Sequence, residues 1–252
     1  MAQPPINQHF FQYFDVLIAN SLELKQEAYA IRYQVYCEEL GFEDKTFFIR
    51  QLELDDFDLH SVHFLIRHKA SGQFAGTVRL ILPRDPILHS DQLLPIEHYC
   101  KTILHPSTEH LYLSARRCAE VSRLAVRAEF RRRPDEQYKT HVSVIPQEWD
   151  PRCFPFISVG LYLSIAAYFV ESTELESVMA LMEPRLARHL SRVGIYFNQV
   201  GSVIDFNGQR APFVVEKASL IANLKDDIRV LFEHIRQGVQ CSLNTQSQQS
   251  FR

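Results

Sequence analysis

The stretch from Cys118 to Arg133 reads C-A-E-V-S-R-L-A-V-R-A-E-F-R-R-R and decides the fold. Its apolar residues predict a mostly buried β-strand, which also carries Glu120, Ser122 and Arg123. Three consecutive arginines, 131–133, follow where the strand should end. The chain therefore takes a carboxylate and a guanidinium into a sheet, beside a cluster of positive charge.

Burial of either charged group without a partner costs several kcal/mol. Glu120 and Arg123 therefore either form a structural ion pair or act on a charged molecule. The arginines that follow favour the second interpretation, because such a cluster suits an anionic ligand or an acidic partner protein.

The composition is that of a globular protein in which any basic patch is local. The chain has 252 residues, 46% of them hydrophobic, and a formal net charge of −3. This length suits one large domain or two small ones, with ample apolar content for a core. The slightly acidic balance argues against a general nucleic-acid binder, which would be clearly basic.

The cysteines and histidines predict neither a disulfide framework nor a metal site. The five cysteines are dispersed without a C-x-x-C pair, and the eleven histidines show no metal-binding spacing. The first residues, M-A-Q-P-P-I-N-Q, lack the features of a signal peptide. We expect a cytoplasmic protein in a reducing compartment, with no bound cofactor.

Hydrophobic periodicity and turn residues predict a single α/β domain with a mixed sheet. An amphipathic helix over 22–40 ends at Gly41, and Asn207-Gly208 is a strong hairpin turn. The other predicted elements are strands at 63–68, 76–82, 177–182, 199–206 and 211–217, and helices at 156–171, 184–193 and 220–238.

The regions between these elements set the expected boundaries of the domain. We expect an N-terminal segment at 1–19, the domain at 20–238, and a polar, disordered tail at 239–252. Residues 83–106, with one helical turn, and 134–155 are predicted to be irregular.

The uncharged segment from Phe154 to Val170 has two interpretations. It is slightly short for the roughly 30 Å of hydrocarbon in a bilayer. Pro155 suits the first turn of a helix, where its missing N–H is harmless. We favour a buried core helix, packed on the sheet, over a membrane span.

Four motifs, in this order, resemble one family of enzymes. They are I-R-Y-Q-V-Y-C-E-E-L-G-F from Ile31, L-E-L-D-D-F-D from Leu52, G-T-V-R-L from Gly76 and E-V-S-R-L-A-V from Glu120. The combination resembles the acyl-homoserine-lactone synthases. It is more similar still to the N-acyl amino acid synthase-like acyltransferases associated with PEP-CTERM/exosortase systems. The resemblance implies the GCN5-related N-acyltransferase (GNAT) fold: a mixed sheet, splayed at its middle, with a pantetheine arm in the cleft.

The resemblance also implies roles for particular residues. The positions that match the family's substrate-binding residues are Arg32, Tyr36, Phe42, Asp55, Asp58 and Arg79, and its Glu-x-x-Arg pair falls on Glu120 and Arg123. A structural interpretation stays open for the two aspartates. They would then form a network with Arg32 and Arg79 that orders the N-terminal region over the cleft.

Two departures from the family pattern bear on the substrates. Phe42 stands where the lactone synthases usually have Trp, which puts their methionine-derived lactone precursor in doubt. After the splayed strand, acetyl-CoA enzymes of this fold have a glycine-containing loop whose amides hold a pyrophosphate. This chain has F-R-R-R-P there, without glycine. A carrier protein's phosphopantetheine has one phosphate and needs no such loop, which favours acyl carrier protein over CoA as the donor.

The chemistry of acyl transfer to an amine assigns roles to the strand residues. An amino acid's ammonium is mostly protonated at neutral pH, so a proton acceptor is needed. Glu120, buried and so liable to a raised pKa, is the candidate base. Backbone amides around Ser122 to Leu124 are candidates to stabilise the oxyanion. Arg123 would orient Glu120 or bind the acceptor's carboxylate.

The basic residues after the strand have both a functional and a structural interpretation. As a function, they would bind an acidic carrier protein or its phosphate, and the residues concerned are Arg127, Arg131, Arg132 and Arg133, with Lys139 nearby. As structure, they are a solvated turn.

These arguments predict an acyltransferase that moves a fatty acyl chain from acyl carrier protein to the amino group of a small acceptor, such as an amino acid. An apolar tunnel between the sheet and the helix at 156–169 would hold the chain. One alternative is a lactone synthase that uses S-adenosylmethionine. Another is a non-catalytic module that binds acyl groups or acyl carrier protein.

Overall fold

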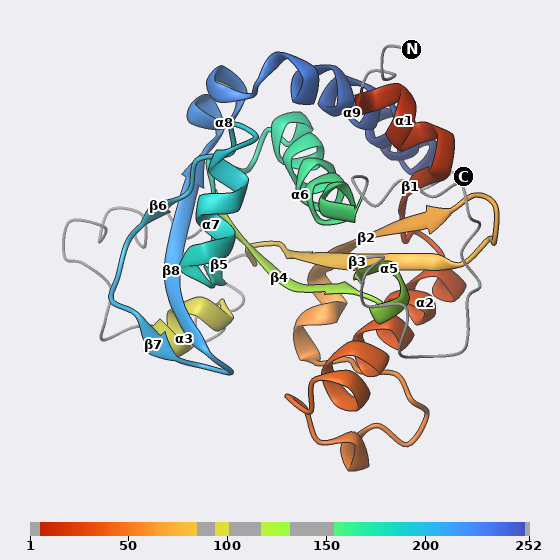
Figure 1. Ribbon diagram of the computed structural model, residues 1–252, viewed down its shortest axis with the longest axis vertical. Helices are drawn as coiled ribbons and strands as arrows, with labels where there is room; N and C mark the ends of the chain where they lie inside the picture. The colour runs from red at the N-terminus through yellow and green to blue at the C-terminus, as the bar shows by residue number, and fades with distance from the viewer. Residues whose placement is uncertain (1–5, 85–93, 101–116, 132–153, 250–252) are drawn as a thin grey trace, which may run out of the picture.

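An eight-stranded mixed sheet runs through the centre of the molecule (Figure 1). The computed structural model describes residues 6–84, 94–100, 117–131 and 154–249. The strands lie in the order β1-β2-β3-β4-β5-β8-β6, and β7 pairs with β8. Their bounds are β1 Phe14–Ile18, β2 Ser61–His68, β3 Phe74–Ile81, β4 Cys118–Val126, β5 Ser177–Met182, β6 Asn198–Gln199, β7 Ile204–Asp205 and β8 Gln209–Glu216.

The parallel pair β4 and β5 separates half-way along β4. Pairing begins at Cys118 with Ser177 and ends at Val121 with Ala180, although β4 continues to Val126. All other neighbours in the sheet are antiparallel. Beyond Val121 the β1–β4 half and the β5–β8 half run in different directions (Figure 1). We call this opening the splay, as the sequence led us to expect.

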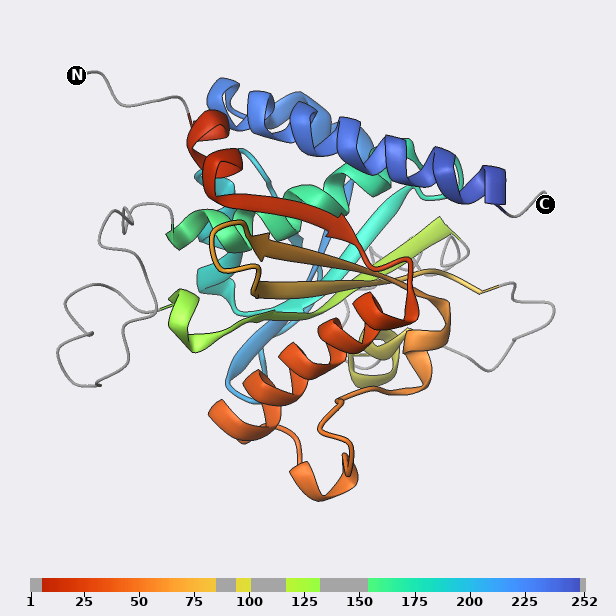
Figure 2. The ribbon, with the colours of Figure 1, turned by 90° about the vertical axis from the view of Figure 1, so that its right-hand side faces the viewer.

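Helices cover both faces of the sheet (Figure 2). Contacts place α2 (Leu22–Arg32) on β2, β3 and β4, and α6 (Phe154–Glu171) on the opposite face against β1 to β4. A second layer, made of α1 (Ile6–Tyr13) and α9 (Asp226–Gln249), packs over α6. The shorter helices are α3 Pro95–Cys100, α5 Ala128–Arg131, α7 Pro184–Ser191 and α8 Lys217–Asn223.

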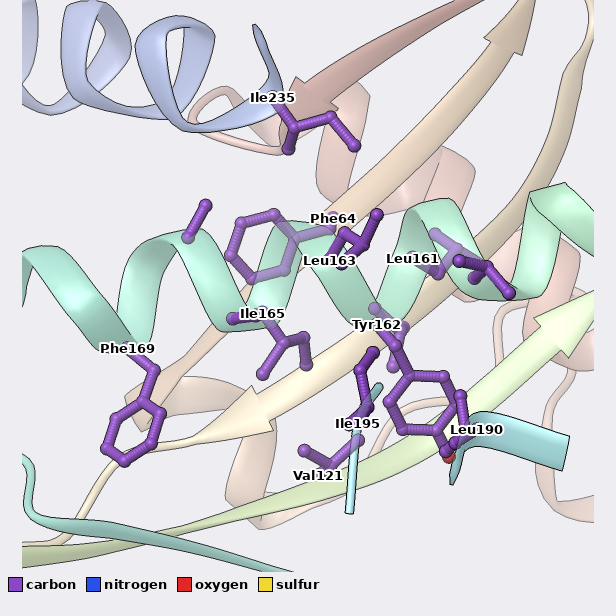
Figure 3. Packing of buried hydrophobic residues seen from close by; sticks show 14 of the residues in the cluster. Phe64, Val121, Leu161, Tyr162, Leu163, Ile165, Phe169, Leu190, Ile195 and Ile235 are labelled. Atoms are coloured by element: carbon purple, nitrogen blue, oxygen red, sulfur yellow. The ribbon is translucent and has the colours of Figure 1, made fainter. Parts of the chain in front are cut away.

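The uncharged segment forms α6 as predicted, and its described side chains belong to the main apolar core. Leu161, Leu163 and Ala167 are buried between the sheet and α9. Figure 3 shows Tyr162 and Ile165 on the side of α6 that faces Val121 of β4. Within the described parts of the chain, no helix combines the length and apolarity that a membrane crossing requires.

The helix predicted over 22–40 is continuous but changes its winding. Ser21 caps α2 by accepting a hydrogen bond from the Leu24 amide, and the helix continues as a π-helix, η1, over Tyr33–Glu39. Gly41, at φ 64°, ends it as predicted. The π-helical winding was not predictable from the apolar spacing. It carries Tyr36, one of the residues that the resemblance singles out.

Most other predicted elements are confirmed with small shifts in their ends, but the strand expected at 199–206 is two short strands, β6 and β7. The strand at 177–182 is β5, and Asn207 and Gly208 both have positive φ in the turn between β7 and β8. The short helical turn predicted within 83–106 is α3. Residues 85–93 and 101–106 of that region, and 134–153, lie outside the described residues.

Three differences from the sequence analysis concern the ends of the chain. The segment before residue 20 contains α1 and β1, which were not predicted. The helix expected at 220–238 is two helices, broken where Leu224 turns extended and Asp226 and Asp227 begin α9. α9 continues to Gln249, through residues expected to form a disordered tail. The helix continues because Leu243, four residues after the buried Val239, lies on the same apolar face and packs on the core. The prediction of a disordered tail did not take this residue into account.

Gly194 should be essential to the turn that follows α7. Its φ is 93°, and an added Cβ would lie 2.2 Å from the backbone oxygen of Asn223. Gly194→Ala combines left-handed strain with a clash against backbone, so we expect it to destabilise the fold by about 2 kcal/mol or more in urea unfolding. Gly208→Ala is the matched control, because its φ is 100° but a Cβ would meet nothing within 4 Å. Equal losses in the two variants would contradict the clash.

Candidate active site

A cavity of about 190 Å³ opens at the splay. Its wall is formed by residues between Tyr36 and Arg79, by α3, by β4 and by the β7–β8 hairpin. The lining residues are Tyr36, Phe42, Glu43, Asp55, Phe57, Arg79, Pro95, Ile96, His98, Tyr99, Glu120, Val121, Ser122, Arg123, Leu181, Phe206, Asn207 and Arg210. Seven of the nine residues that the sequence analysis assigned to catalysis or substrate binding line this one cavity, Glu120, Ser122 and Arg123 among them.

Glu120 is the buried carboxylate of this cavity. Its Oε2 accepts a hydrogen bond of 2.8 Å from the backbone amide of Ile96, the second residue of α3. No cationic side chain of the described residues forms an ion pair with it. Burial, partly offset by the Ile96 amide, raises the pKa of Glu120 to about 8. Glu120 is therefore poised to exchange a proton near neutral pH.

A second buried carboxylate, Glu97, lies on α3 close to Glu120. Its Oε2 accepts from the Leu94 amide at 2.7 Å, and burial raises its pKa. Its negative charge is one of the causes that raise the pKa of Glu120. The sequence analysis missed Glu97, although Pro95 followed two residues later by Glu is a helix-start signal that was present in the sequence.

A bulge in β4 lies beside Glu120. Arg79 of β3 pairs with Ser122 and Thr77 pairs with Ala125, so two β4 residues, Arg123 and Leu124, oppose one β3 residue. Arg123 takes a φ of 53°, which is rare for a non-glycine residue. Because pairing with β5 has ended at Val121, the backbone here has no strand partner on the β5 side.

Arg123 forms ion pairs with other carboxylates and not with Glu120. Its Nη2 lies 3.0 Å from Glu43 Oε1, and its Nε lies 3.2 Å from Glu53 Oε1. The guanidinium also lies over the ring of Tyr36, 5.6 Å from its centroid. The structural ion pair considered between Glu120 and Arg123 is therefore absent among the described residues. Arg123 instead ties β4 to the loop that follows η1.

An ionic cluster of buried charges supports this wall. Its centre is Asp58, whose Oδ1 accepts from Arg32 at 2.6 Å and from Arg79 at 2.8 Å. Arg32 also pairs with Glu53, and Arg79 pairs with Asp55 at 2.5 Å. We use "ionic cluster" for Arg32, Glu43, Glu53, Asp55, Asp58, Arg79 and Arg123.

The spacing of Asp55 and Asp58 has a local structural cause. The two residues form a capping box at the short helix η3 (Asp56–His60), in which the Asp55 amide donates to Asp58 Oδ2 at 2.8 Å. The network with Arg32 and Arg79 that the sequence analysis left open is present. Asp55 and Arg79 also line the cavity, whereas Asp58 and Arg32 are buried in the cluster and do not line it.

His63 extends the ionic cluster under α2. Both ring nitrogens are buried without a hydrogen-bond partner in the described structure, and Nε2 lies 3.5 Å from Asp58 Oδ1. Burial lowers the pKa of His63 to about 3, in spite of the nearby carboxylate. The imidazole is therefore neutral at physiological pH, and the positive charge of the cluster comes from Arg32, Arg79 and Arg123.

Aromatic rings complete two sides of the cavity. Tyr36 and Phe42 stack with centroids 6.4 Å apart, and the Tyr36 hydroxyl donates to the Leu124 carbonyl at 2.7 Å. Across the cavity, Tyr99 of α3 meets Phe206 of the β7–β8 hairpin at 4.8 Å between centroids. Tyr36 and Phe42 thus lie where the resemblance placed them, and Tyr99 and Phe206 are additions.

A smaller apolar cavity, of about 20 Å³, lies on the α6 side of the sheet. Tyr162, Ile165, Ala166 and Phe169 of α6 line it together with Val121. Val121 also lines the larger cavity, so this residue lies between the two spaces, at the point where β4 leaves β5. The predicted tunnel wall on this helix therefore faces an existing, narrow apolar space.

The basic segment after β4 is only partly described. Arg131, in α5, forms an ion pair with Glu39, and Arg127 donates its backbone amide to Ala75 at 3.0 Å. Arg132, Arg133 and Lys139, for which binding roles were predicted, lie outside the described residues. Among the residues that are described, no group of three or more His, Cys, Asp or Glu is placed to hold a metal ion.

The ionic-cluster carboxylates Glu43 and Glu53 were missed, and a signal for Glu53 existed. It lies in the motif L-E-L-D-D-F-D, where only the two spaced aspartates were singled out. No local pattern points to Arg210, Phe206 or Tyr99, because the sheet order and the turn at Asn207 bring them to the cavity.

Comparison with protein families matches residues 31–139 to the model described as an acetyltransferase (GNAT) domain. No curated protein matches the sequence. Residues 31–139 thus match a GNAT domain within a single mixed α/β fold, and the match and the fold support an acyltransferase. The predicted fold class is confirmed.

Solved structures that share this fold include three synthases. FeeM, an N-acyl amino acid synthase from uncultured soil microbes, has a TM-score of 0.56 and 15% identity, over 84% of this chain and 94% of its own. The acyl-homoserine-lactone synthase LasI has a TM-score of 0.54 and 16% identity, over 84% and 96%. The CoA-dependent acyl-homoserine-lactone synthase BjaI, solved with SAM and isopentyl-CoA, has a TM-score of 0.51 and 15% identity. The match covers 88% of this chain and 89% of BjaI. At these identities the likeness is one of fold.

Asp58 should carry much of the stability of the ionic cluster. Asp58→Asn leaves two buried guanidiniums without their shared carboxylate, so we expect a loss of about 3 to 5 kcal/mol at pH 7 in urea unfolding. The neighbouring arginines hold the pKa of Asp58 well below its usual range. Its contribution is therefore complete above the unfolded pKa of about 4 and is lost as pH falls toward the lower folded pKa.

The difference between wild type and Asp58→Asn should accordingly shrink below about pH 4. Glu176→Gln is the control, because its pair with Arg117 is about half exposed and should contribute less than about 1 kcal/mol. An Asp58→Asn variant as stable as the control at pH 7 would show that the cluster is not a stabilising element.

Proposed function

We propose that this protein transfers a fatty acyl chain from an acyl-phosphopantetheine thioester to the amino group of a small acceptor, such as an amino acid. The observation that carries the proposal is Glu120: a carboxylate without a cationic partner, with a pKa near 8, in a cavity at the splay. The four motifs that resemble PEP-CTERM/exosortase-associated acyltransferases, and the fold shared with FeeM, support the same activity.

Glu120 would act as the base of the reaction. The acceptor's nitrogen attacks the thioester carbonyl carbon, the C–S bond breaks, and the thiol leaves. The amine must lose a proton for this step, and Glu120 accepts it directly or through a water. A carboxylate whose pKa lies near 8 is well matched to an amine that must be deprotonated near neutral pH.

The bulge in β4 would stabilise the tetrahedral intermediate. Backbone amides that are not used in strand pairing are suitable donors to an oxyanion, and the segment Ser122–Leu124 has lost its β5 neighbour. The Ser122 hydroxyl accepts a hydrogen bond from Arg79 Nε at 3.0 Å. We therefore assign Ser122 a role through its backbone and through the position of Arg79.

The acyl chain would pass through the splay into the apolar cavity under α6. Val121 lines both cavities, and the inner one is lined by apolar and aromatic side chains. The inner cavity, at about 20 Å³, holds only a few atoms, so its side chains must move apart to admit a chain. Burial of each methylene then contributes about 0.8 kcal/mol to binding.

The donor is proposed to be acyl carrier protein, with acyl-CoA as the alternative. The reason is the segment F-R-R-R-P after β4, which lacks the glycines that would hold a pyrophosphate. The arginines would bind the acidic carrier or its single phosphate. BjaI is a CoA-dependent enzyme with the same fold, so the donor must be decided by comparing the two thioesters.

Two other functions remain as alternatives. A lactone synthase would need S-adenosylmethionine, and the fold shared with LasI supports this candidate, whereas Phe42 in place of the usual Trp speaks against it. A module that only binds acyl groups or acyl carrier protein would not need a base. Such a module should keep its ligand affinity when Glu120 is changed.

Glu120→Gln should lower kcat roughly 10²- to 10⁴-fold while leaving the melting temperature close to wild type, because it removes the proton acceptor and keeps the shape. The assay measures acyl transfer from decanoyl-acyl carrier protein and from decanoyl-CoA to a panel of amino acids, with product detected by mass spectrometry. In wild type, kcat/KM should rise with pH through about 8 as Glu120 ionises.

In Glu120→Gln the rise of kcat/KM through about pH 8 should be lost. The pH dependence that remains should come from ionisation of the acceptor amine alone. Glu183→Gln, an exposed residue at the start of α7, is the control and should behave like wild type. A folded Glu120→Gln enzyme that works at full rate would remove Glu120 from the mechanism. A wild type that forms product only with S-adenosylmethionine would favour the lactone synthase.

Ala166→Phe should shorten the preferred acyl chain. The new ring would occupy the inner cavity, so chains that no longer fit should lose affinity steeply. The measurement is a chain-length profile of kcat/KM with donors from short to long. Ala166→Gly is the matched control and should shift the profile toward longer chains. An unchanged profile in both folded variants would place the acyl chain elsewhere.

A further inference from the structure

Arg210 differs from the other arginines of the cavity because none of the described residues gives it an anionic partner. Arg79 and Arg123 line the same cavity, but each is paired with carboxylates of the ionic cluster. Across the described parts of the chain, no carboxylate forms an ion pair with Arg210, and its buried Nε has no hydrogen-bond acceptor. A buried donor left in this state is unfavourable unless a ligand satisfies it.

Arg210 lies at the edge of the cavity that opens at the splay. It is the second residue of β8, directly after the turn at Asn207-Gly208, and Phe206 and Asn207 line the cavity with it. Its positive charge acts on the phenols of Tyr36 and Tyr162, and opposes the rise that burial causes in the pKa of each. Tyr36 lines the larger cavity and Tyr162 lines the inner cavity, so the guanidinium is near residues of both spaces.

The two unpaired charges of the cavity therefore have opposite signs. Among the residues that the structure describes, no cation pairs with Glu120 on β4, and no anion pairs with Arg210 across the splay on β8. A molecule that carries an amino group and an anionic group close together can satisfy both. An α-amino acid has this arrangement, with its amine toward the base and its carboxylate toward the guanidinium.

We propose that Arg210 binds the carboxylate of the acceptor and selects amino acids over amines that lack one. This assignment rests on the proposed transfer to an amine. It takes the carboxylate-binding role from Arg123, whose donors are already engaged by Glu43 and Glu53. Guanidinium suits the task because it donates two parallel hydrogen bonds to a carboxylate.

The first experiment measures binding, so it does not depend on turnover. N-decanoyl-phenylalanine and its carboxamide, which differ only in the charged group, are titrated calorimetrically into wild type, Arg210→Gln and Arg210→Lys. Wild type should bind the carboxylate form roughly 10- to 100-fold more tightly, as expected for hydrogen bonds to a charged group. Arg210→Gln should bind both forms equally, and Arg210→Lys should keep part of the preference.

Arg185→Gln is the matched control. Arg185 is an exposed arginine on α7 that does not line the cavity, so its variant should keep the wild-type preference. A preference that survives in Arg210→Gln would overturn the proposal. So would a wild type that binds acid and carboxamide equally.

The second experiment separates the acceptor's carboxylate from the donor's phosphate, the other anion of the reaction. Phenylalanine and phenethylamine are acylated with decanoyl-acyl carrier protein or with decanoyl-pantetheine, which lacks the phosphate. Arg210→Gln should raise the KM for phenylalanine roughly 10- to 100-fold and leave that for phenethylamine unchanged. A KM increase for the carrier-protein donor, absent with the pantetheine donor, would assign Arg210 to the phosphate and overturn the proposal.

Failure of the proposed function would look different. A wild type that acylates no amine with any donor would refute acyl transfer, while the binding preference would still decide whether Arg210 recognises a carboxylate.

Discussion

The separation of β4 from β5 after Val121 is the constraint on which the rest of the structure depends. Parallel strands in the middle of a sheet normally satisfy each other's backbone groups along their whole length. Here the sheet gives up that pairing in its centre, and the gap is occupied by Tyr36, Arg123, Arg210 and the two cavities. Charged side chains can be held in the middle of the molecule because the sheet itself is open there.

How far the sequence predicts this arrangement depends on the range of the interactions. The strand with Glu120, the core helix α6 and the turn at Asn207-Gly208 follow from local patterns, since apolar periodicity and turn chemistry act over a few residues. The approach of Arg210 to the cavity, and the pairing of Arg123 with Glu43 and Glu53, depend on the order of strands and on contacts between residues 70 or more positions apart. No spacing in the sequence carries that information.

The same limit explains the errors at the ends of the chain. α9 was expected to stop near residue 238 because the residues that follow are polar. Its continuation depends on Leu243, a single apolar residue that packs on the core. Likewise the five residues of β1 are too few for a clear strand pattern in the sequence. They form a strand because they pair with the edge of β2. Tertiary contacts outweigh weak local preference in both places.

The ionic cluster makes the two sides of the cavity unequal. On one side, charged hydrogen bonds join α2, the loop at 43–58, β3 and β4, so this wall can open only if several buried ion pairs break together. On the other side, α3 and the β7–β8 hairpin meet through the rings of Tyr99 and Phe206. Ring contacts are short-range and less directional than charged hydrogen bonds, and they re-form after small displacements. We therefore expect ligands to enter and leave between α3 and the hairpin, with the opposite wall as the fixed surface against which they are aligned.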